Sequence, residues 1–155
     1  QKATYFLQEM LRVNLGYTFI MYKHGPYSFE LTDELTKLRA DRLLKLLPKG
    51  GYGPSIVLEE SPYINKLFVE NRDMLDEHHF SVEYVSGKLA DKKVMELERL
   101  ATALYVTRET METNAEIRTK RIRELKPHVS EKDAQRAIEI IDDMMKELAQ
   151  RSLMH

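Results

Sequence analysis

The segment "MYKHGPYS", from Met21 to Ser28, holds the side chain with the strongest potential for chemistry, a histidine beside a Gly-Pro turn. Nucleophilic catalysis at His24 would require a serine, or a carboxylate that orients the ring. The nearest carboxylate in the sequence is Glu30, although partners could also arrive from elsewhere in the fold. We interpret the segment as a structural corner in which the histidine bonds a carbonyl group of the turn. The corner residues are His24, Gly25, Pro26 and Ser28.

Two other segments contain residue types found in metal or phosphate sites. "DEHHF", from Asp76 to Phe80, has adjacent histidines that point to different sides of a helix or a strand, and it lacks the i, i+4 histidine pair of a zinc face. We predict a solvated loop there. "KGGYGP" lacks the Lys-Ser/Thr of a phosphate-binding loop and precedes a predicted strand. The sequence therefore predicts no catalytic residue, no metal site and no cofactor.

The composition restricts what this protein can bind and where in the cell we expect it. The 155 residues include 24 lysines and arginines and 25 acidic residues, so no overall charge attracts nucleic acid or membrane. The sequence has no cysteine, which excludes disulfides and thiolate metal sites and fits a reducing cytoplasm. No apolar run approaches the roughly 20 residues of a membrane span. We expect a cytoplasmic protein that makes no membrane contact.

The order of elements through Glu60 predicts a winged-helix-like domain. Apolar spacing from Ala3 to Leu11 indicates a helix, and because the pattern starts at once we expect the chain to begin inside it. Ser28 is suited to cap a further helix, in which Leu31, Leu35 and Leu38 share one side. The predicted elements are the first helix ended by Gly16, a strand over Tyr17–Tyr22 broken at Gly25-Pro26, a helix over Phe29–Arg39, and a hairpin of Leu43–Leu47 and Ser55–Leu58 joined by Pro48–Pro54.

The remainder, residues 61–155, reads as a helical extension after a domain of residues 1–60. Helical periodicity is moderate from Ile64 to Leu75, ambiguous from His78 to Lys88 and strong from Val94 to Tyr105. The last two predicted helices are joined by "LKPHVS", and a connection this short makes them an antiparallel hairpin. The fold class is mainly α with a small β-hairpin.

The charges on the Phe29–Arg39 helix indicate whether this helix can bind in a DNA groove. Its outer face carries Glu30, Asp33 and Lys37, with Glu34 and Asp41 at the edge, and these acids would repel phosphate. A basic margin along the hairpin could still bind DNA. The candidate contact residues for a protein or DNA partner are Glu30, Asp33, Lys37, Arg39, Arg42, Lys45 and Lys49.

The most basic segment is "IRTKRIRELK", Ile117 to Lys126. No aromatic residue alternates with its bases, so stacking on single strands is not indicated. Arg118 and Arg121 fall in the same arc as the apolar residues, which predicts that both face the neighbouring helix, where Asp142 is a natural partner for Arg118. We favour an ion pair between helices over a phosphate site.

"QKATYFLQ" and "YKHGPYS" together resemble an uncharacterised prokaryotic family with a winged-helix-like N-terminal domain. They are more distantly similar to the Panacea, or SocA-like, antitoxin-associated domain, with its "LQK…YF … YGP" arrangement. "LKPHVSEKDAQRAIE" resembles the helical tail of the closer family. The resemblance implies a cytoplasmic regulatory or adaptor module and carries over no reaction; His24 stands where an aromatic or small residue is common. The matching positions are Gln1, Lys2, Tyr5, Phe6, Tyr22, Gly25, Pro26 and Ser28.

Two hypotheses for function follow. A non-enzymatic module that binds a protein partner should present an apolar or mixed groove, whereas a DNA-binding regulator should present a continuous basic strip. The acidic helix favours the protein partner, with DNA as the alternative and self-association left open.

Overall fold

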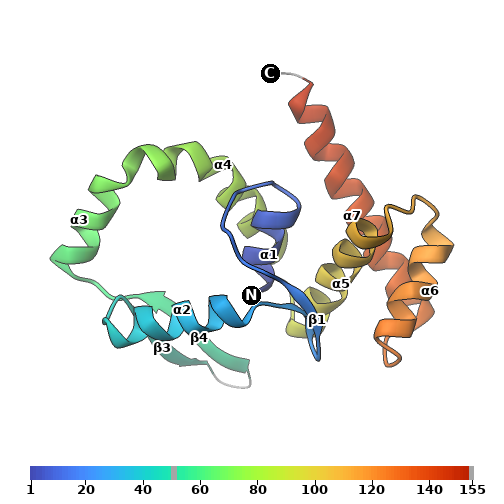
Figure 1. Ribbon diagram of the computed structural model, residues 1–155, viewed down its shortest axis with the longest axis horizontal. Helices are drawn as coiled ribbons and strands as arrows, with labels where there is room; N and C mark the ends of the chain where they lie inside the picture. The colour runs from blue at the N-terminus through green and yellow to red at the C-terminus, as the bar shows by residue number, and fades with distance from the viewer. Residues whose placement is uncertain (50–51, 154–155) are drawn as a thin grey trace.

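The computed structural model describes residues 1–49 and 52–153, which form seven helices and two separate two-stranded antiparallel sheets (Figure 1). The chain is mainly helical, as the sequence predicts. The elements are α1 (Lys2–Glu9), β1 (Ile20–Tyr22), β2 (Gly25–Tyr27), α2 (Phe29–Ala40), β3 (Leu44–Lys49), β4 (Tyr52–Leu58), α3 (Pro62–Glu70), α4 (Arg72–Leu89), α5 (Val94–Thr110), α6 (Ala115–Leu125) and α7 (Glu131–Ser152).

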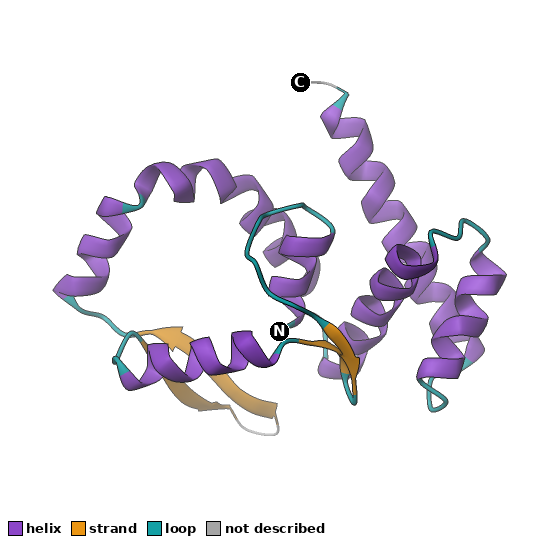
Figure 2. Cartoon of the chain, in the orientation of Figure 1, coloured by secondary structure: helices purple, strands orange, loops and turns teal. Residues whose placement is uncertain are grey.

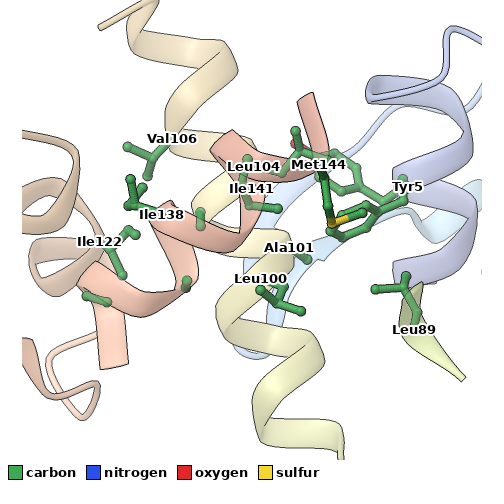
Figure 3. Packing of buried hydrophobic residues seen from close by; sticks show 14 of the residues in the cluster. Tyr5, Leu89, Leu100, Ala101, Leu104, Val106, Ile122, Ile138, Ile141 and Met144 are labelled. Atoms are coloured by element: carbon green, nitrogen blue, oxygen red, sulfur yellow. The ribbon is translucent and has the colours of Figure 1, made fainter. Parts of the chain in front are cut away.

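The hydrophobic core lies among α1, the end of α4, and the helices α5, α6 and α7 (Figure 3). Helix α7 places an apolar stripe against α5 and α6, as its spacing of buried residues requires. Phe6 of α1, Leu104 of α5 and Ile138 and Ile141 of α7 are almost fully buried there. Because Phe6 lies in this cluster, the first helix is part of the same core as the C-terminal helices.

The remaining elements form an open arch beside this core, which we define as α2, β3, β4, α3 and the first turns of α4 (Figures 1 and 2). Their main contacts are with one another, α2 with β3 and α3 with α4. In the first turns of α4, residues 72–77 are all exposed. The arch therefore has little core of its own.

The predicted helices and the second hairpin are confirmed, with corrections to their bounds and to the segments between them. The first helix ends at Glu9, before the predicted Gly16, and the strand predicted over Tyr17–Tyr22 is limited to Ile20–Tyr22. Gly25-Pro26 does not simply end a strand, because Gly25–Tyr27 is itself a strand that pairs with Ile20–Tyr22. The ambiguous stretch His78–Lys88 is helical, and the predicted loop Asp76–Phe80 lies inside α4. The connector between β3 and β4 is shorter than Pro48–Pro54, since pairing reaches Lys49 and Tyr52; residues 50 and 51 of that connector lie outside the described chain.

Packing crosses the predicted boundary near residue 60. Helix α1 contacts α4 and α5, and β2 contacts α5. Helix α2, β3 and β4 belong to the same predicted domain of residues 1–60, but they lie in the arch and not in the core. The division into residues 1–60 and 61–155 stays a prediction.

Candidate functional site

The corner around Ser28 joins the β1–β2 hairpin to α2. The Ser28 hydroxyl accepts a hydrogen bond from the Leu31 amide at 3.2 Å, which is the predicted N-cap. Gln1 holds the same residue twice, donating to the Ser28 carbonyl and accepting from its amide, each at 2.9 Å. Gly25 has a positive φ of 86°, and a Cβ there would lie 3.3 Å from Thr102 Oγ1. The corner is therefore packed directly on α5.

His24 has a different partner from the turn carbonyl that we predicted. Its Nδ1 lies 3.4 Å from Glu98 Oε2, a carboxylate on α5, while the imidazole is 70% exposed. The contact joins residues 74 positions apart in sequence. The carboxylate reaches the histidine through the tertiary fold, and no local sequence pattern predicts the contact.

Glu98 is the centre of a polar cluster under the β1–β2 hairpin. Only 5% of Glu98 is exposed, and its Oε1 lies 3.4 Å from Lys126 Nζ and 3.5 Å from His128 Nε2. Among the described residues, no donor makes a hydrogen bond of good geometry to Oε1. We call Lys2, His24, Glu98, Lys126 and His128 the Glu98 cluster.

The two lysines of this cluster bind the hairpin backbone. Lys126 Nζ donates to the carbonyls of Tyr22 at 2.7 Å and Lys23 at 2.6 Å, and Lys2 Nζ donates to the carbonyl of Pro26 at 2.8 Å. Burial lowers the pKa of Lys2 to about 8, with Glu98 opposing and Lys126 reinforcing that shift. The ammonium groups thus fasten the hairpin to α1 and to the end of α6, and Glu98 on α5 offsets part of their charge.

Sequence reasoning missed Glu98 and Lys126 as members of this site. A signal was present, because Glu98 lies one turn after Val94 and one turn before Ala101, inside the apolar stripe of α5. A carboxylate at such a position is buried on folding and requires a cation.

The second candidate is an apolar groove on the arch, with a volume of about 640 Å³. Its walls come from α2, from the ends of the β3–β4 hairpin, and from α3 and α4. Among the described residues that line it, only Glu34 and Asn71 are polar. Phe68 and Met74 are 45% and 48% exposed, so large apolar side chains of this groove face solvent. The lining residues are Glu34, Leu38, Leu43, Leu44, Leu58, Ile64, Leu67, Phe68, Asn71, Met74 and Leu75.

The predicted partner-contact residues are divided between α2 and the hairpin. On α2 and just after it, the exposed residues are Glu30, Asp33, Lys37, Arg39 and Arg42. Lys45 lies 3.4 Å from Glu59 and is thereby paired with an acid, which weakens the expected basic margin. The side chain of Lys49 lies outside the described part of the structure.

The basic segment on α6 contains the predicted ion pair between helices. Arg118 is 2% exposed and donates from Nη1 and Nη2 to the two carboxylate oxygens of Asp142, each at 2.7 Å. The prediction for Arg121 was wrong, because its side chain is 44% exposed and pairs with Glu124 on the same helix. Arg118 therefore belongs to the core and is not available to phosphate.

Within residues 1–49 and 52–153, no group of three histidine or acidic side chains is placed to hold a metal ion. None of the helices in these same ranges is both long and apolar enough to cross a bilayer. Comparison with known protein families finds no matching family model, and no curated protein matches the chain either.

Proposed function

We propose that this chain is a non-enzymatic cytoplasmic module of regulatory or adaptor type, and that it binds a protein partner through the groove on the arch. The observation that carries the proposal is the apolar lining, in which Phe68 and Met74 are about half exposed. Exposed apolar surface of this kind is typical of sites where proteins bind other molecules.

The Glu98 cluster supports a structural role for the histidine segment in place of catalysis. Both lysines of the cluster donate to main-chain carbonyls, and Glu98 is buried beneath the hairpin. These polar groups are engaged in holding the chain together. His24→Ala should accordingly leave partner binding intact.

The DNA-binding alternative predicts a basic surface on α2 or the hairpin. The exposed side chains of α2 include three acids, Glu30, Asp33 and Glu34, against two bases, Lys37 and Arg39, and Lys45 is paired with Glu59. Approach of a phosphate backbone to these carboxylates would be repulsive. The acidic surface favours a protein partner.

The test compares Phe68→Asp with Val69→Asp. Both residues lie on α3 and are exposed, Val69 at 75%, but only Phe68 lines the groove. Proteins captured from a lysate are identified by mass spectrometry, and those that use the groove should be lost with Phe68→Asp and retained with Val69→Asp. A salt-titrated binding assay with random-sequence DNA runs in parallel. Submicromolar DNA binding at physiological salt, unaffected by Phe68→Asp, would favour the DNA regulator instead.

A further inference from the structure

We infer that the occupant of the groove is an amphipathic helix of a partner protein that carries apolar anchors on one side and lysine or arginine beside them. This inference rests on the proposed function, since it names the partner for the same groove.

The backbone of the occupant decides between a helix and an extended strand. Every backbone N–H and C=O that enters an apolar site must have a hydrogen-bond partner. The lining offers two polar side chains, and Asn71 Nδ2 already donates to the Leu67 carbonyl at 2.9 Å. An extended peptide would therefore leave backbone groups unpaired, whereas a helix satisfies its own.

A strand could also pair with the edge of the β3–β4 sheet, but the groove does not present that edge. Leu44 and Leu58 line it, and they are opposite each other in the register at the end of the hairpin farthest from the turn. The sheet thus contributes the side chains at its end, and side-chain contact of this kind fits an apolar helix face.

The charge beside the groove determines the sign of the charge expected on the partner. Glu34 lines the groove. Glu30, four residues before it on α2, and Asp41, the C-cap residue seven after it, follow the same side of the helix. Lys37 is the base within this row. Neither Glu34 nor Asp41 has an ion-pair partner within the described chain, whereas Lys66 of α3 and Arg72 of α4 are paired with Glu70 and Asp76. Lys37 is likewise without an ion-pair partner among the described residues, so the row holds three acids and one base. Its net charge is acidic, which favours a basic flank on the helix.

The experiment selects ligands for the full chain from a displayed library of random 16-residue peptides. Peptides that use the groove are recognised by weaker binding to Phe68→Asp and to Met74→Asp than to the parent chain. Two variants are used so that misfolding of one cannot account for the result. Selected peptides should bind the parent chain at least tenfold more tightly than either variant. They should carry apolar residues at i, i+3 or i+4, and i+7, be enriched in lysine and arginine, and gain helicity by circular dichroism when bound.

A charge reversal tests the basic flank. Glu34→Lys should weaken binding of the selected peptides at least fivefold, whereas Asp143→Lys should change it less than twofold, because Asp143 is 80% exposed on α7 and lies outside the groove. Groove-dependent peptides that are acidic, proline-rich or apolar at every second residue would overturn the helix and leave the proposed function standing. Self-association lost with Phe68→Asp would identify a second copy as the occupant and also overturn it. If neither peptides nor captured proteins depend on Phe68 or Met74, the proposed function itself fails.

Discussion

Glu98→Gln should destabilise the fold by about 3 kcal/mol, because it removes the negative charge beside the buried ammonium of Lys126. Glu98 Oε1 and Lys126 Nζ are 3.4 Å apart, and both side chains are at most 7% exposed. Unit charges at this distance attract by about 5 kcal/mol at an effective dielectric constant of about 20. Removing one partner of a buried pair costs about 3–5 kcal/mol. We expect the lower end because glutamine keeps an acceptor oxygen and Lys126 keeps the carbonyls of Tyr22 and Lys23.

The assay is urea unfolding at pH 7, read as a change in midpoint at constant slope. Lys126→Met and the double variant complete a mutant cycle, and the double variant should lose at least about 1.5 kcal/mol less than the sum of the single losses. Arg72→Met is the control, because the Arg72–Asp76 pair is exposed and should contribute less than about 0.5 kcal/mol. A loss below about 0.5 kcal/mol for Glu98→Gln, or strict additivity in the cycle, would refute the reasoning.

Three other predictions concern stability and are measured by the same unfolding assay. Arg118→Met should lower the free energy of unfolding by about 3 kcal/mol, because it leaves Asp142 without its two hydrogen bonds. Arg121→Met, at an exposed pair, should lower it by less than about 0.5 kcal/mol. Equal losses for the two variants would contradict this prediction. Gly25→Ala should cost about 1–3 kcal/mol, because φ is +86° and α5 is in contact, while Gly87→Ala, inside α4 with open space around it, should be neutral or stabilising. The pKa of Lys2 is lowered from its ordinary value of 10.5 to about 8 in the folded chain. Between pH 8 and 10.5 the unfolded chain therefore binds more protons, so stability should rise with pH in this window, and the rise should be absent in Lys2→Met. Above about pH 10, tyrosines whose pKa values are raised by burial oppose the rise.

The parts of the structure that depend on neighbours in the sequence were predicted well. Ser28 caps α2 because an N-cap needs only a hydroxyl at the helix start. The Arg118–Asp142 pair was also predicted, although 24 residues separate its members. A short connection made the two helices antiparallel, and helical periodicity placed each residue beside an apolar stripe.

Features that depend on distant packing were not predicted. Glu98 meets His24 and Lys126 because α5 passes beneath the β1–β2 hairpin, and no local spacing encodes that approach. The stretch His78–Lys88 of α4 was ambiguous because Val85 is its one buried residue and the others are exposed or half-buried, so no continuous apolar stripe marks the helix. The groove was expected as a class of surface, but its walls come from α2, α3 and α4 together.

The two candidate sites are connected through the helices that form the groove walls. Helix α2 begins at Ser28, which Gln1 holds and which follows directly on the hairpin fastened by the Glu98 cluster. Helix α4 enters the core only near its end, where Val85 and Leu89 are buried. Each wall is thus anchored at one end, and the hairpin β3–β4 and α3 have their main contacts within the arch. Since few buried contacts fix the width of the groove, its shape depends on these two anchors, and a helix seated between α2 and α4 would supply the apolar contacts that the arch lacks.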